Sequence, residues 1–483
     1  MAKIGNKNDA SLDPAPLAEP EGGYKHLIFH GVGLHVPQAW EIGEHKGDGL
    51  YGSFRVDGAD RVMAHVRWWK APKRFRIERA VVQFRRSMGR RKRGKDEPAV
   101  PVVVPTHRVK APVELGDDTR VFVAGFADSA EREPKIVTDV LVCAHARTVG
   151  RAAIWRFCIQ DKTPTFRQID LMCRGLIVQD LNAWRDWALF DMRFQSPPGA
   201  RNDRTFLKAG VCFLRFTWRK GSVGIRRFSA ATAVLGSLTP DEDDLRRWCR
   251  GAFASEFFDM RYEVESEAIS DRLLCLRLKG RPKRLAPLEL RWVLIRHRRL
   301  PREMEVYWDR EANKIVCFEI LKRTEANAAT IRRMIDSYHS WICDQAARPS
   351  GAAAPKRRSG KSTARLRSLR ARILPTKTVQ WSLNDKGLVE LTYQFKRPAK
   401  LRILRLLGSQ RVGPAVDTRR VELDLIGSVV WQACQGGDKR VCDLIDQLQR
   451  QLLISYREAE ISVTQYVKTL GERNILALRI PPK

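Results

Sequence analysis

The chain has 483 residues, of which 43% are hydrophobic and 30% charged, so it can hold two to four domains with substantial hydrophobic cores. Lysine and arginine number 88 against 55 acidic residues, which gives a formal net charge of +33. This excess would attract phosphate backbones, anionic lipids or acidic protein surfaces, although a generally arginine-rich composition explains it equally well. No apolar run approaches the roughly 20 residues of a membrane-spanning helix, which excludes an ordinary helical membrane protein.

The N-terminal segment and the cysteines indicate where the protein works. Residues 1–23 lack the apolar stretch of a signal peptide and are expected to form a flexible leader. The ten cysteines are scattered and none belongs to a CxxC pair, as is typical of reduced, buried thiols. We therefore expect a cytoplasmic protein.

Residues 24–345 are rich in strand signals. Alternating apolar segments flank Asp57–Gly58 and Asn313, which predicts a hairpin at each place. Helices are expected within 165–184 and 240–253. Apolar residues at helical spacing predict a third helix at 326–343.

Two stretches of this region resemble each other. The segments that begin near 26 and near 187 each place an apolar strand before a proline turn and continue with aromatic-rich hairpins. This favours two related lobes, 24–182 and 183–345. The final strands and helix of the second lobe, "WDREANKIVCFEI" through "SYHSW", are similar to the end of a PsbP-like α/β/α sandwich domain.

Two basic stretches interrupt the sequence. Residues 85–95, "RRSMGRRKRGK", are expected to form a solvated loop. Residues 346–372 begin with proline and small residues and then become basic, which is typical of a flexible linker. The basic side chains of this linker that are candidates for binding a polyanion are Arg357, Arg358, Lys361, Arg365, Arg367 and Arg370.

The sequence contains no common catalytic motif. There is no P-loop, no GxGxxG after a strand, no HExxH and no GxSxG. His26, His30 and His35 lie close together, but scattered histidines in a strand-rich region are more often core-edge residues than ligands. We expect no enzyme activity, no metal and no cofactor. The thirteen tryptophans are expected to anchor cores, with a stacking platform for single-stranded nucleic acid as the alternative.

Residues 373–483 predict a small winged-helix-like domain. A strand at 419–424 precedes a helix that Asp424 can cap, and further helices are expected at about 440–453 and 457–474. A last strand is expected at 475–480. The whole chain is thus predicted to be a multidomain α+β protein, with a strand-rich α/β N-terminal region and this C-terminal domain.

About 65 residues of this domain resemble the PqqD family. The matching positions are Leu423–Asp424, Ile426–Gly427, Val430–Trp431, Cys434, Gly436, Leu444–Ile445, Leu448, Tyr466, Leu470 and Ile475–Leu476. Members of that family bind the leader of a ribosomally made precursor peptide and present it to a modifying enzyme, often a radical SAM enzyme. The resemblance implies the same partners here.

Charge favours a peptide over DNA as the ligand of this domain. Residues 415–483 contain ten basic and nine acidic residues, a net charge of +1. A DNA-reading third helix should begin with lysine or arginine, yet Glu458 and Glu460 open this one. We therefore expect an extended peptide to add to a strand edge, either 419–424 or 389–395. The expected contact residues are Arg420, Val421, Glu422, Leu423, Asp424 and Trp431. The alternative is a nucleic-acid-associated protein that uses the basic linker and arginine-rich N-terminal faces.

Overall fold

The structure is a computed structural model. It describes residues 23–58, 61–72, 74–91, 102–104, 119–127, 139–159, 164–208, 210–219, 221–237, 239–252, 260–282, 303–322, 325–346, 371–376, 379–384, 388–396, 416–435, 439–452, 454, 456–473 and 475–479. The chain is α+β and multidomain, as predicted, and forms two compact units. One unit lies within residues 1–203, 216–221 and 323–355, and the other within 204–215, 222–322 and 356–483.

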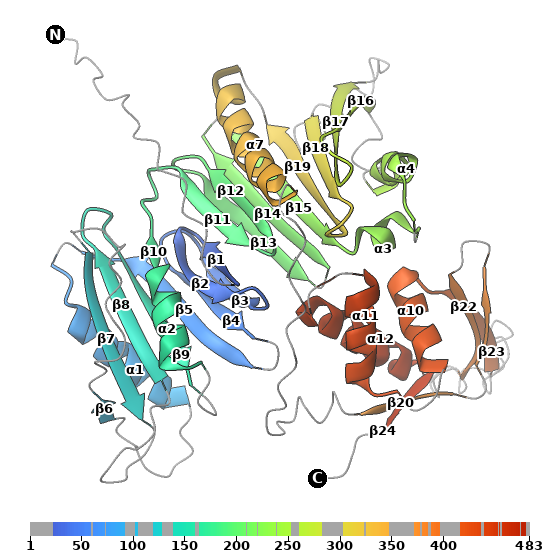
Figure 1. The fold of residues 1–483 in the computed structure, drawn as a ribbon, viewed down its shortest axis with the longest axis horizontal. Coiled ribbons are helices and arrows are strands. Elements are labelled where there is room, and N and C mark those ends of the chain that lie inside the picture. The colour runs from blue at the N-terminus through green and yellow to red at the C-terminus, as the bar shows by residue number, and fades with distance from the viewer. Residues whose placement is uncertain are drawn as a thin grey trace, which may run out of the picture. The chain divides into compact units, whose positions relative to one another are not determined.

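The first lobe begins with a hairpin and continues with a seven-stranded antiparallel sheet (Figure 1). The hairpin strands are β1 (Tyr24–Phe29) and β2 (Val32–Pro37). The sheet has the order β3-β4-β5-β9-β8-β7-β6. Its strands are β3 (Glu41–Gly47), β4 (Gly52–Asp57), β5 (Val62–Lys70), β6 (Val102–Val104), β7 (Thr119–Ala127), β8 (Asp139–Ala146) and β9 (Arg151–Cys158). Helix α1 (Ile77–Arg91) precedes β6, and α2 (Phe166–Arg174) and the short β10 (Ile177–Val178) follow β9.

The second lobe repeats this strand order. Its hairpin is β11 (Arg185–Leu189) and β12 (Met192–Ser196), and its sheet has the order β13-β14-β15-β19-β18-β17-β16. The sheet strands are β13 (Arg201–Lys208), β14 (Val211–Trp218), β15 (Gly221–Ser229), β16 (Met260–Ala268), β17 (Leu273–Pro282), β18 (Glu303–Asp309) and β19 (Lys314–Lys322). Helices α3 (Ala231–Leu235) and α4 (Glu242–Ala252) precede β16, and α7 (Glu325–Ala346) follows β19. In each sheet the strand that comes last in the sequence (β9 or β19) lies beside the third strand (β5 or β15). The two segments that resemble each other in sequence thus begin lobes of the same sheet topology.

The two hairpins join in one five-stranded sheet of order β10-β2-β1-β11-β12. Strand β1 pairs antiparallel with β11, and Ile28 lies opposite Ala188. Both hairpins turn through two residues with positive φ, His30 and Gly31 in one and Phe190 and Asp191 in the other. Two-residue turns of this handedness match the twist of antiparallel strands.

The helices follow from apolar spacing, with two corrections. The helix expected within 165–184 ends at Arg174, where Gly175 terminates it, and residues 177–178 form strand β10 instead. Residues 85–91, expected in a solvated loop, belong to helix α1, because Ile77 and Val81 recur at helical spacing and are buried on one face. The rest of that basic stretch lies outside the described residues. Helix α7 spans the predicted 326–343 segment and extends it slightly at both ends. The hairpins at Gly58 and at Asn313 are confirmed.

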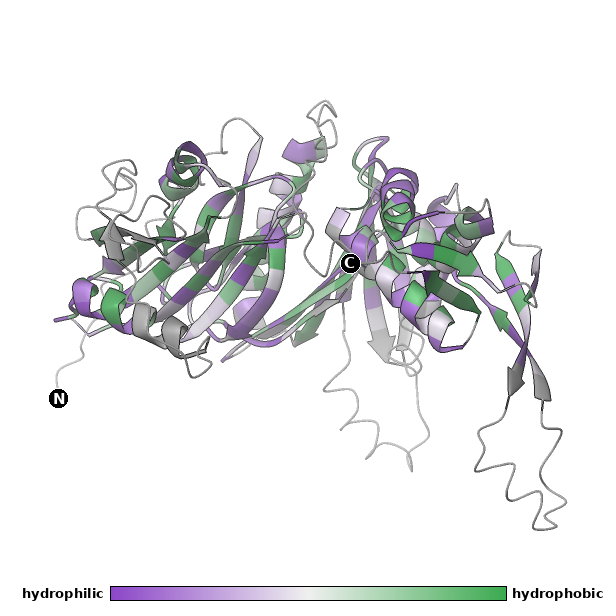
Figure 2. Ribbon diagram, turned by 90° about the horizontal axis from the view of Figure 1, so that it is seen from below, coloured by the Kyte–Doolittle hydropathy of each residue, from purple (hydrophilic) through white to green (hydrophobic). Residues whose placement is uncertain are grey.

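Several of the tryptophans that were predicted to anchor cores do so, whereas Trp69, Trp184 and Trp218 are only half-buried. Trp68, Trp155, Trp187 and Trp308 are each at most 2% exposed. Figure 2 shows polar and apolar residues mixed along the strands, as expected when alternate side chains point to opposite faces of a sheet.

The C-terminal domain (described residues 371–479) contains three helices, a three-stranded sheet and a two-stranded ribbon. The sheet has the order β21 (Gln380–Leu383), β22 (Val389–Lys396) and β23 (Val416–Glu422). The helices are α10 (Leu425–Gln435), α11 (Val441–Leu452) and α12 (Tyr456–Glu472). The terminal strand β24 (Leu476–Arg479) pairs with β20 (Arg372–Pro375), a strand that the sequence analysis did not predict. The linker arginines and lysine at 357–370, expected to bind a polyanion, lie outside the described residues.

Candidate functional site

The three-stranded sheet of the C-terminal domain has one central strand and two outer strands. Strand β22 pairs with β21 along residues 389–392 and with β23 along residues 390–396, so the first half of the 389–395 segment has a neighbouring strand on both sides. Strand β23 pairs with β22 alone, and Leu391 lies opposite Val421. In the described part of the chain, no strand occupies the other edge of β23. Of the two receiving edges considered from the sequence, the one on β23 is therefore the longer side without a neighbouring strand among the described residues.

The six predicted contact residues separate into surface and core positions. Arg420 and Glu422 are exposed on β23, and Arg420 forms an ion pair with Glu390 of the neighbouring strand. Asp424 is also exposed. Leu423 and Trp431, in contrast, are 5% and 1% exposed and belong to the hydrophobic core, while Val421 is half-buried against it.

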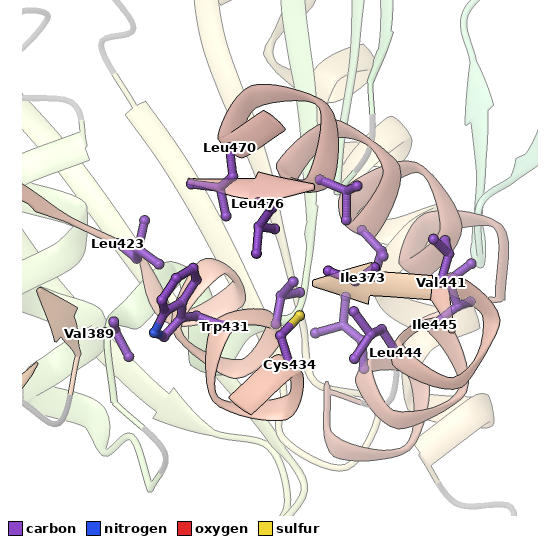
Figure 3. Packing of buried hydrophobic residues seen from close by; sticks show 14 of the residues in the cluster. Ile373, Val389, Leu423, Trp431, Cys434, Val441, Leu444, Ile445, Leu470 and Leu476 are labelled. Carbon is purple, nitrogen blue, oxygen red and sulfur yellow. The ribbon is translucent and has the colours of Figure 1, made fainter. Parts of the chain in front are cut away.

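Trp431 is a core residue because α10 turns it inward. It lies beside Val389 and Leu423 (Figure 3). Cys434, three residues later on the same helix, is completely buried. This helical spacing marks Trp431 as part of the inward face, so it supports the position of β23 from beneath and does not offer a surface for direct contact.

A compact hydrogen-bond network fixes the end of β23 to the start of α10. The Asp424 Oδ1 atom accepts a hydrogen bond of 2.7 Å from the Gly427 N–H, which caps the helix as predicted. The Ser428 hydroxyl accepts a hydrogen bond of 2.9 Å from the Val389 N–H and donates one to the Leu423 carbonyl. The Leu423 N–H in turn donates to the Val389 carbonyl at 2.8 Å. The helix therefore sets the position of the strand edge.

Tyr466 of α12 packs against this junction. Its ring lies so close to Gly427 that a Cβ atom there would be 2.6 Å from Tyr466 Cε1. Burial raises the pKa of Tyr466, and the nearby Asp424 carboxylate raises it further. The phenol therefore stays neutral at physiological pH, so the side chain beside the exposed Asp424 is uncharged. From the sequence, Tyr466 was identified only as one of the positions that resemble the PqqD family.

The first half of α12 is buried on more than one face. Ala459 and Val463 point into the domain core, and the polar residues Glu458, Glu460 and Ser462 are each at most 9% exposed. The Arg227 Nη1 atom on β15 donates 2.8 Å to Glu458. A helix with these contacts cannot place its N-terminal side chains in a major groove, as a DNA-recognition helix does.

A second contact ties the end of α11 to the second lobe. The Asn313 amide donates 2.7 Å to the Leu452 carbonyl. Ala230, just before α3, belongs to the same hydrophobic cluster as the helices of the C-terminal domain. The domain thus packs on the second lobe through α11 and α12, and these contacts do not involve β23.

No family model matches the sequence, and no curated protein is significantly similar to it. Among the residues that the structure describes, no helix combines the length and the apolar character needed to cross a lipid bilayer. The same residues contain no group of three or more histidine, cysteine, aspartate or glutamate side chains suited to hold a metal ion.

Proposed function

We propose that the C-terminal domain binds an extended peptide, which adds as a fourth strand alongside β23. The supporting observation is that α11 and α12 carry the contacts to the second lobe, while the outer edge of β23 bears no strand of the described chain. Main-chain hydrogen bonds would supply affinity for the guest, and neighbouring side chains would select its sequence. The guest is a precursor peptide, held for a modifying enzyme of the radical SAM class.

The hydrogen bonds between β23 and β22 show which backbone N–H and C=O groups of β23 such a guest would use. The Leu423 N–H points to β22, where it bonds to Val389. In an antiparallel strand, successive residues point their N–H and C=O groups to opposite edges. The backbone N–H and C=O groups of Thr418, Arg420 and Glu422 therefore point away from β22, and a guest strand would pair with these three residues.

The side chains around this edge are of mixed charge. Arg420 lies between Glu390 across the sheet and Glu422 on its own strand, and the segment 415–483 has a net charge of only +1. Binding that depends on main-chain hydrogen bonds at such an edge should depend weakly on salt. Binding of nucleic acid through the remaining excess of basic residues should instead weaken steeply as salt rises.

Selection of peptides on the full-length protein tests the proposal. Twelve-residue peptides from a random phage-displayed library would be selected, synthesised with a fluorophore and titrated by anisotropy at 50 and 300 mM NaCl. We expect affinities that change less than about threefold over this range. Single-stranded RNA and duplex DNA would be titrated in parallel. Tight nucleic-acid binding with a steep salt dependence, and no enriched peptide, would support the nucleic-acid alternative and overturn the proposal.

A further inference from the structure

Two buried arginines lie where the two hairpins meet in the first compact unit. Arg151 begins β9 and Arg185 begins β11, and they are 2% and 3% exposed. Gly31, in the turn of the first hairpin, lies against both side chains. A Cβ atom on Gly31 would be 3.3 Å from Arg151 Nη1 and 3.5 Å from Arg185 Cδ. The two cationic side chains are therefore neighbours.

Backbone carbonyls are the acceptors for both arginines. Arg151 donates from Nη1 to Gln179 at 2.8 Å and from Nη2 to His30 and to Gly49, both at 3.0 Å. Arg185 donates from Nη2 to the Ala200 carbonyl. The Nε atoms of both arginines are buried and have no hydrogen-bond partner among the described residues. Two buried N–H donors, one on each arginine, thus remain unused.

Carboxylates do not neutralise this pair. Among the described residues, no carboxylate oxygen lies within 4.0 Å of either guanidinium. Asp180 is the carboxylate whose charge raises the pKa of both arginines from a greater distance. The buried Asp186 instead accepts hydrogen bonds from the Gln179 and Gln195 side-chain amides.

The pair remains charged at neutral pH. Burial lowers the pKa of Arg185 to about 10, and burial together with the charge of Arg185 lowers the pKa of Arg151 to about 10. His30, beside them, is neutral because burial and the two arginines lower its pKa. Two adjacent buried cations without a carboxylate in direct contact are costly, since each has lost its hydration. A bound anion would remove this cost.

The turn between β3 and β4 lies beside Arg185 and carries exposed side chains. Gly49 lies in this turn, and a Cβ atom there would be 3.4 Å from Leu181 Cδ2 and 3.6 Å from Arg185 Nη1, so a side chain at this position would contact the guanidinium. Leu50 and Tyr51, the next two residues, are 44% and 56% exposed. An anion with an organic substituent would place that substituent against these two exposed side chains.

We propose that Arg151 and Arg185 form a binding site for a phosphate group that enters past Gly49. Two guanidiniums match the double negative charge of phosphate and offer it several N–H donors. The site lies in the first compact unit and is independent of the peptide-binding role proposed for the C-terminal domain.

Thermal unfolding of the full-length protein tests this site. Inorganic phosphate and phenyl phosphate would be titrated at constant ionic strength, with sodium chloride as the reference. We expect a saturable rise in Tm of about 3 °C, as for a ligand that binds only the folded state. A larger effect of phenyl phosphate would identify the ligand as a phosphate monoester, and a larger effect of inorganic phosphate would identify it as the free ion.

Three variants separate specific binding from general salt effects. Arg185→Gln should abolish the saturable rise. Gly49→Leu keeps both arginines but covers Arg185, and should abolish it as well. Arg67→Gln, which removes an exposed arginine from β5 of the same sheet, should leave it unchanged. An equal rise in all four proteins, or no saturable rise in the wild type, would show that the arginines serve only to tie backbone turns together.

Discussion

The Arg227 guanidinium on β15 donates a hydrogen bond of 2.8 Å to the Glu458 carboxylate on α12, and their side chains are only 5% and 11% exposed. These residues are 231 positions apart in the sequence. The pair anchors the first turn of α12 on the second lobe. The pair therefore covers the first turn of α12. A winged helix that reads DNA would need this part of its recognition helix to be exposed.

Arg227→Ala should destabilise the protein by about 3–5 kcal/mol, because it leaves the Glu458 charge buried without this partner. The free energy of unfolding would be measured by urea denaturation. Arg247→Ala, which breaks an ion pair whose arginine is 75% exposed, should cost no more than about 0.5 kcal/mol. Equal effects of the two substitutions would mean that Glu458 is well solvated.

Gly427→Ala should destabilise the C-terminal domain by about 1–3 kcal/mol, since the added methyl group would overlap the Tyr466 ring. Gly251→Ala is the matched control. Gly251 also lies in a helix, but a Cβ atom there meets nothing within 4 Å. That substitution should stabilise the protein by about 0.5–1 kcal/mol through helix propensity. Denaturation midpoints report both changes, and a stabilising Gly427→Ala would contradict the close packing described here.

Trp431→Ala should cost about 3–5 kcal/mol, because it empties a completely enclosed part of the core. Trp381→Ala, at a 42% exposed position on β21, should cost much less. Trp431→Phe should retain peptide binding if the tryptophan only supports β23 from beneath. If Trp431→Phe had normal stability but no longer bound the peptide, Trp431 would have to contact the peptide directly.

The first lobe should lose stability as the pH falls below about 6.5. Burial, together with the adjacent His26, lowers the pKa of His35 to about 4. The His30 pKa is also well below its usual value. Since the folded state favours the neutral rings, this stability is fully present above pH 6.5 and is lost as protons bind the unfolded state at lower pH. The decline should continue to about pH 4 for His35.

Thermal unfolding at pH 7, 6, 5 and 4 would measure this effect. His35→Gln should flatten the profile between pH 6.5 and 4 relative to the wild type. A wild-type Tm that is constant from pH 7 to pH 4 would contradict the buried, neutral state of these histidines.

Long amphipathic elements could be predicted from the sequence, whereas short or distant pairings could not. Helix α11 buries Val441, Leu444, Ile445, Leu448 and Leu452 at the spacing that identified it. Strand β20 has only four residues and pairs with β24 about a hundred residues later, and four residues carry too little alternation to show a strand. Residues 85–91 were predicted to form a loop because their many basic residues outweighed the apolar helical spacing of α1 in the sequence.

The candidate site was predicted in part. The edge strand and the Asp424 cap follow from local patterns. The central position of β22 depends on its pairing with β21, a strand without a clear signal. The buried arginine pair was not predictable, since Arg151 and Arg185 resemble any surface arginine in this basic chain. The acceptors of Arg151 include a carbonyl 121 residues away.

Substitution of Arg420 tests the strand-addition proposal most directly. Arg420→Pro removes one outward N–H from β23 without removing a donor to β22, a change that edge strands tolerate. Arg420→Ala removes the side chain and keeps the N–H. For peptides selected on the wild-type protein, we predict at least tenfold weaker binding to Arg420→Pro and nearly unchanged binding to Arg420→Ala. Equal affinity for all three proteins, at unchanged stability, would contradict strand addition at β23.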